Sequence, residues 1–192
     1  MQKIISLFKR DYEGTRQIYD EIVPGAEWVQ AGEGRATRKW DGTCCMVRSG
    51  ILFKRYDAKN GKQTPPDFEP AQEAADPVTG HWPGWVPVRA DNPADKYHMA
   101  AISDHQENTA DSLHDGTYEL VGPNVQGNPD NWDRYYLIAH GGDTLDGVPV
   151  TFDALKAWLA AHPIEGVVWH HSDGRMVKIK RKDFGLPWPV AR

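Results

Sequence analysis

The sequence predicts an α+β fold of mostly antiparallel sheets with few helices. Short extended segments between turn signals dominate the chain, and only two segments have a helical pattern. Prolines between residues 62 and 95 leave little room for long regular elements there, and residues 80–85 are expected to form an ordered surface loop whose two tryptophans pack on the core. The 192 residues fit one domain, residues 1–192, with a core of its own.

Seven apolar, β-branched or aromatic segments between turn signals are expected to be strands. They are residues 3–10, 36–48, 51–56, 117–121, 135–139, 167–170 and 176–180. Two hairpins are expected: Ser49-Gly50 joins the second strand to the third, which Asn60-Gly61 closes, and Ser172-Asp173-Gly174 joins the last two. Residues 17–23 should return beside the first strand, as a strand or as a helical turn.

Two helices are expected. In the first, Asn92 is the N-cap and Pro93 takes the first helical position, and the helix runs to about residue 104. In the second, Thr151 caps residues 152–161. The apolar residues of this segment recur on one helical face: Phe152, Leu155, Trp158 and Leu159.

Charge and cysteine content exclude several classes of protein. A net charge of -5 argues against a protein that coats long duplexes non-specifically. The adjacent Cys44 and Cys45 would point to opposite faces of a strand, so a mutual disulfide is not expected, and without a CxxC pair a structural zinc site has no support. The two cysteines favour a reducing, intracellular (cytoplasmic) location, and no segment is long enough to span a membrane. HExxH, GxSxG and Walker motifs do not occur.

The functional signal begins at Lys39-Trp40-Asp41-Gly42. A lysine amine is a nucleophile only when neutral, and an ordinary pKa of about 10.4 keeps it protonated. Lys178 and Lys180 alternate on an expected strand and so share one face, where they could lower the pKa of Lys39 and meet a phosphate. Gly42 would let the backbone approach a ligand closely. Taken alone, the motif is more readily explained as a surface lysine beside a turn glycine.

Two glutamates lie at strand ends beside glycine-containing turns, Glu119 and Glu165. Such carboxylates can hold Mg²⁺ together with phosphate oxygens, or accept hydrogen bonds from ribose hydroxyls. Lys54 and Arg55 should point to opposite faces of their strand, so only one of them can face a site, and arginine suits bidentate phosphate contact. The alternatives are solvated strand-end glutamates and an exposed charge pair.

Five motifs occur in a fixed order: KWDGT at 39–43, KRYD at 54–57, YELVG at 118–122, EGVV at 165–168 and KIK at 178–180. Together they resemble the covalent nucleotidyltransferases, which comprise polynucleotide ligases and mRNA-capping guanylyltransferases. Within that superfamily the chain is most similar to the small ATP-dependent 5′-to-3′ RNA ligases, a family that includes the vertebrate enzyme. The resemblance covers most of the chain and implies a nucleotidyltransferase (adenylyltransferase) domain.

The resemblance also implies a reaction. Lys39 would attack the α-phosphate of ATP to give lysyl-AMP, AMP would pass to the 5′-phosphate of an RNA end, and a 3′-hydroxyl would displace it. The implied site consists of the nucleophile Lys39, the nucleotide-binding residues Arg38, Arg55, Glu119, Tyr136, Lys178 and Lys180, the supporting residues Asp41, Gly42 and Lys54, and the metal ligand Glu165. In this assignment Glu119 holds the ribose and Tyr136 stacks on adenine. The implied cofactors are ATP and Mg²⁺ or Mn²⁺. The implied partners are RNA ends, and the protein is expected to be a monomer that does not bind a membrane.

Two departures bear on the choice within the superfamily. Cys44 stands where many DNA ligases have an arginine, and few residues follow the last motif, so no OB-fold is expected. Both features favour an RNA ligase. A minimal DNA ligase, a guanylyltransferase and a non-catalytic module that binds RNA ends remain the alternatives.

Overall fold

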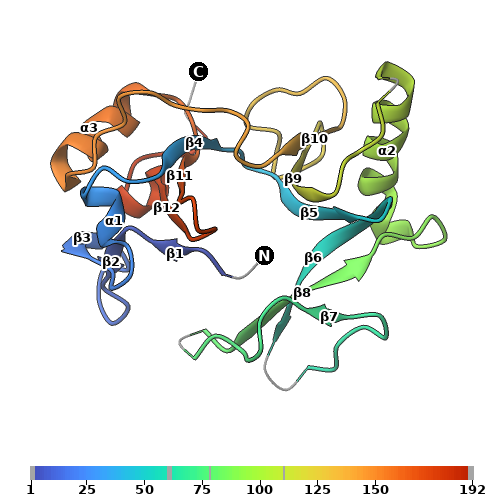
Figure 1. Ribbon diagram of the computed structural model, residues 1–192, viewed down its shortest axis with the longest axis horizontal. Coiled ribbons are helices and arrows are strands. Elements are labelled where there is room, and N and C mark those ends of the chain that lie inside the picture. Colours follow the sequence, from blue (N-terminus) through green and yellow to red (C-terminus); the bar gives the residue numbers. More distant parts are fainter. Residues whose placement is uncertain (1–2, 60–61, 78, 110, 190–192) are drawn as a thin grey trace. The chain divides into compact units, whose positions relative to one another are not determined.

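The structure, a computed structural model, describes residues 3–59, 62–77, 79–109 and 111–189. The chain packs as two compact units, one made of Met1–Lys3 and Asp41–His140 and the other of Ile4–Trp40 and Gly141–Arg192 (Figure 1). We call them the six-stranded unit and the four-stranded unit after their main sheets. The expectation of a single domain stays a prediction, because packing alone does not show whether the units fold separately.

The four-stranded unit is built on a mixed sheet. Its strands lie in the order β1 (Ile5–Ser6), β12 (Met176–Lys180), β11 (Gly166–His170) and β4 (Arg35–Lys39). β11 is antiparallel to both neighbours, whereas β1 is parallel to β12. Leu155 and Leu159 of α3 (Phe152–Ala161) are fully buried in one core with Val167 and Ile179 of the sheet. Aliphatic residues at alternate strand positions thus bury one sheet face and leave the other for polar side chains.

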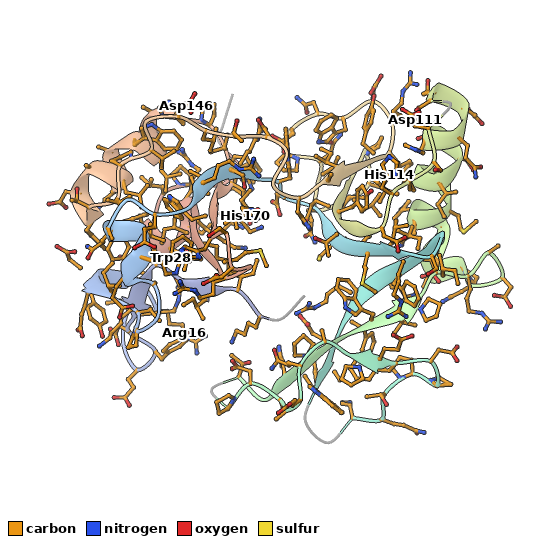
Figure 2. All side chains as sticks on the ribbon, viewed as in Figure 1. Arg16, Trp28, Asp111, His114, Asp146 and His170 are labelled. Carbon is orange, nitrogen blue, oxygen red and sulfur yellow. The ribbon has the colours of Figure 1, made fainter. Side chains whose placement is uncertain are left out.

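Four short elements complete this unit: β2 (Phe8–Arg10), β3 (Ile18–Ile22), α1 (Glu27–Gln30) and the 3₁₀ helix η2 (Arg181–Phe184). Trp28 of α1 is buried in the same core (Figure 2). Its ring also meets the His171 ring edge-on at 5.1 Å. The aromatic contact fixes α1 beside the end of β11.

The six-stranded unit has a wholly antiparallel sheet. Its order is β10 (Tyr136–Ala139), β9 (Gly116–Val121), β5 (Thr43–Arg48), β6 (Ile51–Lys59), β8 (His81–Pro87) and β7 (Glu69–Pro70). The 3₁₀ helix η1 (Pro93–Asp95) leads into α2 (Lys96–Asn108), whose Ala101 is buried with residues of the sheet. These residues are Cys45, Val47, Leu52, Tyr118 and Leu120. They cover one face of the sheet, so the residues that alternate with them along the strands point to the opposite face.

The α+β class, the mostly antiparallel sheets and both hairpins are confirmed. Both helices are confirmed as well, although the first starts as a 3₁₀ turn and extends to Asn108. The Asn92 side chain accepts a hydrogen bond from the Ala94 backbone N at 3.1 Å, as expected of a cap. Thr151 stands at the cap position of α3 without a side-chain cap bond, and only its carbonyl accepts from Leu155 N. The nucleotidyltransferase fold stays a prediction, and Asn60-Gly61 lies outside the described residues.

Three expectations about strands were wrong. Residues 36–48 form two strands in different sheets, broken at 40–42, where the Gly42 backbone N donates to the Glu119 side chain. Residues 81–85 belong to β8 instead of a loop, and Trp85 is buried as expected. Proline is compatible with extended backbone. β7 pairs with β8 over only two residues, so β8 needs few backbone N–H donors on the side that faces β7.

The first expected strand, residues 3–10, divides into β1 and β2 at Leu7. The Leu7 N–H donates to the Lys178 carbonyl, and its side chain is fully buried. Residues 17–23 return as β3, beside β2. In the described part of the chain, no helix is both long and apolar enough to cross a bilayer.

Candidate functional site

Lys39 is the last residue of β4, and the sheet register places two further lysines on its face. Gly166 of β11 is paired with Lys39 on one side and with Lys180 on the other. Paired residues of antiparallel strands point to the same face, so both lysine side chains rise beside Gly166. Lys178 lies two residues before Lys180 and shares that face. The expected clustering of Lys178 and Lys180 with Lys39 on one face is therefore confirmed.

Gly166 is required by the close approach of β12. A Cβ atom at this position would lie 2.1 Å from the Ile179 carbonyl oxygen and 2.9 Å from Lys180 Cα. Both atoms are backbone, so they cannot turn aside as a flexible side chain could. A side chain at this position would therefore have to displace the backbone of β12.

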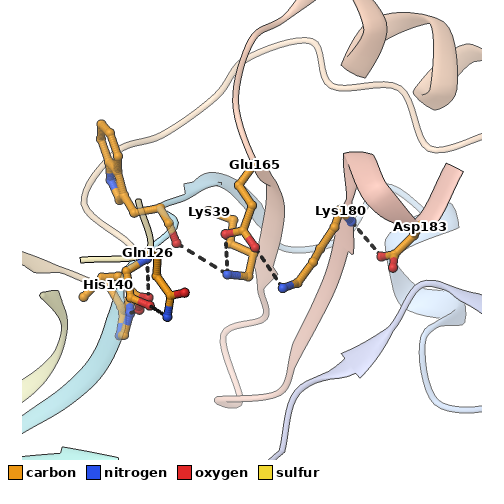
Figure 3. A network of polar contacts seen from close by, with 9 residues as sticks. Lys39, Gln126, His140, Glu165, Lys180 and Asp183 are labelled. Carbon is orange, nitrogen blue, oxygen red and sulfur yellow. Dashed lines mark hydrogen bonds and ion pairs between the residues drawn. The ribbon is translucent and has the colours of Figure 1, made fainter. Parts of the chain in front are cut away.

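Glu165, the residue before this glycine, links two of the lysines (Figure 3). Lys39 Nζ donates to Glu165 Oε2 at 2.6 Å, and Lys180 Nζ pairs with Oε1 at 2.8 Å. The Glu165 side chain is only 6% exposed, so these charge-assisted contacts are shielded from water. A single buried carboxylate thus orients the amines of Lys39 and Lys180.

The lysine cluster changes the acidity of one of its members. Burial, together with the positive charges of Lys180 and Lys39, lowers the pKa of Lys178 to about 8. The cationic surroundings that were expected to lower a lysine pKa thus act on Lys178. An anionic ligand such as a phosphate would relieve this repulsion, because it brings negative charge to the cluster.

Glu119 lies in the six-stranded unit, where β9 pairs it with Cys44 of β5 and Ile138 of β10. Its carboxylate is buried and has two partners. Oε1 accepts from the Gly42 backbone N at 3.1 Å, and Oε2 lies 2.9 Å from His140 Nε2. Glu119 is therefore held in place by the glycine of the lysine motif and by a histidine.

Gly42 permits a close approach, as expected, but the approach is to the protein itself. A Cβ atom there would lie 2.2 Å from the Leu120 carbonyl oxygen and 2.8 Å from Glu119 Cγ. Asp41 begins the six-stranded unit, directly after Trp40 ends a segment of the other unit. The Trp40 carbonyl accepts a long hydrogen bond from Lys39 Nζ, at 3.4 Å. The motif thus supports Glu119 as well as supplying Lys39.

Lys54 and Arg55 point to opposite faces, as expected. Lys54 is paired with Cys45 in the sheet and forms an ion pair with the buried Asp95, on the face that α2 covers. The register consequently puts Arg55 on the face that carries Glu119. Of the two, only Arg55 can serve a site on that face.

Tyr136 and Arg38 complete the expected residues. Tyr136 is paired with Val121, so it shares a sheet face with Glu119; it is 36% exposed and lies beside Trp132, with 5.0 Å between ring centroids. This position leaves its ring available for stacking. Arg38 points away from Lys39 by strand alternation and stacks over Trp40 at 3.6 Å. The structure therefore does not bring Arg38 to the lysine cluster.

Two contacts of the site had no signal in the sequence. His140 joins Glu119, and Gln126 donates to the Gly42 carbonyl at 3.3 Å. Neither belongs to a motif, and His140 is one of eight histidines, so only the strand register could have singled it out. Among the described residues, Glu165 belongs to no group of three or more cysteine, histidine or acidic side chains that could hold a metal ion. A Mg²⁺ ion there would need phosphate oxygens and water as its other ligands, which is how this ion meets nucleotides.

The chain is similar to known proteins described as RNA ligases. A family model described as RNA ligase 1 matches residues 107–192. The chain is 29% identical over 221 residues to RNA ligase 1 of Pongo abelii, with 80% of this chain and 68% of the relative covered. For RNA ligase 1 of Danio rerio the identity is 29% over 251 residues, with 95% and 77% covered, and for that of Mus musculus 27% over 222 residues, with 81% and 68% covered. These matches support the assignment of the chain to the RNA ligase family, which is the family that the motifs indicated.

Proposed function

We propose that the chain is an ATP-dependent RNA ligase that joins 5′-phosphate and 3′-hydroxyl RNA ends through a lysyl-AMP intermediate on Lys39. The observation that supports this most is the placement of Lys39 on one sheet face with Lys178 and Lys180, with its amine held by Glu165. Relatives named RNA ligase 1 support the general class. The nucleotide and the intermediate follow from the resemblance and from the chemistry of the lysines.

In the first step the neutral amine of Lys39 would attack the α-phosphorus of ATP. The N–P bond forms, the bond from this phosphorus to the bridging oxygen breaks, and pyrophosphate leaves with the electron pair. The amine must first lose a proton, because only its neutral form is a nucleophile. Glu165 orients the amine, and Lys178 and Lys180 offer positive charge to the phosphate oxygens as charge builds up on them.

In the later steps AMP would pass from Lys39 to the 5′-phosphate of an RNA end, and a 3′-hydroxyl would displace it. We assign ribose contact to Glu119, phosphate or ribose contact to Arg55 and adenine stacking to Tyr136, since these three share one sheet face. Glu165 would hold Mg²⁺ or Mn²⁺ with phosphate oxygens and water, and the ion would neutralise phosphate charge.

Intact-mass measurement after incubation with single nucleotides tests the proposal. With Mg²⁺ or Mn²⁺ present, ATP should add one adenylyl group, and peptide mapping should place it on Lys39. Labelling by GTP alone would identify a guanylyltransferase. An absence of adduct with ATP, GTP and NAD would favour the module that only binds RNA ends. Nicked RNA and nicked DNA substrates then separate an RNA ligase from a minimal DNA ligase.

Nucleotide affinity should fall as the pH rises through about 8, the pKa of Lys178. A phosphate favours the charged lysine, so binding is strongest below this pKa, where Lys178 is protonated, and weakens above it as the charge is lost. Arginine keeps its charge throughout, so Lys178→Arg should flatten the dependence. The measurement is the dissociation constant of a non-hydrolysable ATP analogue from about pH 6 to about pH 10 for both proteins. An identical profile for the two proteins would contradict the assigned role.

A further inference from the structure

Three side chains with metal-binding chemistry meet on the face of the six-stranded sheet opposite α2. Cys44 comes from β5, Glu119 from β9, and His140 directly follows β10. One ligand atom of each lies within 4.8 Å of those of the other two. In the described ranges of the chain, this is the one such group of three cysteine, histidine or acidic side chains.

The sheet register explains why they meet. Cys44 and Glu119 are cross-strand partners, and the His140 backbone N donates to the Thr117 carbonyl, which continues the pairing of β10 with β9. Two adjacent strands, β5 and β9, and the residue that directly follows a third, β10, thus each supply one ligand. The arrangement is set by the backbone and does not depend on long flexible side chains.

We propose that Cys44, Glu119 and His140 bind a thiophilic divalent cation of the Zn²⁺ type. A thiolate, an imidazole nitrogen and a carboxylate are all zinc ligands, and three protein ligands leave a fourth tetrahedral position open. Bonds of about 2.0–2.3 Å place tetrahedral ligand atoms roughly 3.3–3.7 Å apart. The group therefore needs to close by about 1 Å at its widest, which a side-chain rotation of Cys44 supplies. Sulfur as a ligand disfavours Mg²⁺ and Ca²⁺.

The surroundings of the three ligands favour binding. The Gly42 backbone N donates to Glu119 Oε1 and so orients the carboxylate, as outer partners of metal ligands commonly do. Glu119 is buried, and Cys44 and His140 are half-buried, so water competes weakly for a bound ion. His140 Nε2 lies 2.9 Å from the Glu119 carboxylate, and Nδ1 is buried and has no hydrogen-bond partner, so no other bond would have to be given up at Nδ1.

This site goes beyond the proposed ligase and does not depend on it. Its ligands do not include the lysines or Glu165, and metal binding can be measured without any nucleotide. Glu119 is shared with the proposed ribose contact. If both proposals hold, Zn²⁺ and ATP compete for this carboxylate. Each proposal is measured without the ligand of the other, so the failure of one leaves the other standing.

The test is a cobalt titration of the full chain after removal of metal with a chelator. Co²⁺ should produce the near-ultraviolet charge-transfer absorption of a thiolate ligand and the visible bands of a tetrahedral site, saturating at one equivalent, and Zn²⁺ should displace it. Cys44→Ala should remove the thiolate absorption. Cys45→Ala is the matched control: it removes the neighbouring thiol, which is buried on the opposite face, and should keep the absorption.

Absorption retained in Cys44→Ala, or lost equally in Cys45→Ala, would overturn the proposal. A second measurement covers the case in which Cys44→Ala does not fold. Zn²⁺ should raise the melting temperature of the unmodified chain and of Cys45→Ala, because it binds the folded state. In His140→Gln the affinity for Zn²⁺ should fall at least tenfold, and an unchanged affinity would also overturn the site.

Discussion

Replacing Lys39 with arginine is expected to abolish the AMP adduct and to leave the fold intact. The guanidinium has a pKa above about 12, so it is never neutral and cannot attack phosphorus. It can still donate to Glu165, so the buried carboxylate keeps a cationic partner. Lys39→Ala should abolish the adduct too, but it leaves Lys180 as the remaining lysine partner of Glu165. Binding of RNA ends should be largely retained in this variant. Intact mass after incubation with ATP measures the loss.

Lys156→Ala is the matched control for Lys39→Arg. Lys156 lies on the exposed side of α3 in the same unit, and its substitution should leave labelling unchanged. An adduct that persists in Lys39→Arg would show that another residue is the nucleophile. Lys178 is then the first to test, because its pKa of about 8 gives it a substantial neutral fraction near neutral pH.

Local patterns in the sequence were sufficient for much of the fold. Turn residues predicted both hairpins, and the spacing of Phe152, Leu155 and Leu159 predicted α3. The break at 40–42 could not be predicted, because residues 36–48 read as one extended segment. Their division depends on β4 pairing with β11, which lies more than a hundred residues further along the chain. β8 was missed for a related reason: its prolines and glycine disfavour a strand locally, and the long partner β6 outweighs them.

The site was predicted in its residue types better than in its contacts. Alternation alone predicted that Lys178 and Lys180 share a face and that Lys54 and Arg55 do not. The pairing of Glu165 with Lys39 joins residues 126 positions apart, so it depends on the register of two strands. Glu119 was expected at a strand end, but it lies within β9, and its contact with His140 depends on the position of β10.

Replacing Gly166 with alanine is expected to lower the free energy of unfolding by about 3 kcal/mol or more. A Cβ atom 2.1 Å from the Ile179 carbonyl oxygen must displace backbone of β12, and such overpacking commonly costs about 1–3 kcal/mol even where side chains can adjust. The same displacement would move Lys180 away from Lys39, so AMP labelling should fall as well. Urea unfolding gives the stability, and intact mass gives the labelling.

Gly116→Ala separates this steric effect from the general effect of glycine in a strand. Gly116 is also the first residue of its strand, β9, but a Cβ atom there would meet only Tyr118 Cε2, at 3.8 Å. Its substitution should change stability by no more than about 1 kcal/mol, and a gain is as reasonable as a loss. If Gly166→Ala and Gly116→Ala have equal free energies of unfolding, the backbone of β12 can move to accommodate the added methyl group. Lost labelling at unchanged stability would then show that Gly166 serves to keep Lys39 and Lys180 together, since β12 would have moved without weakening the core.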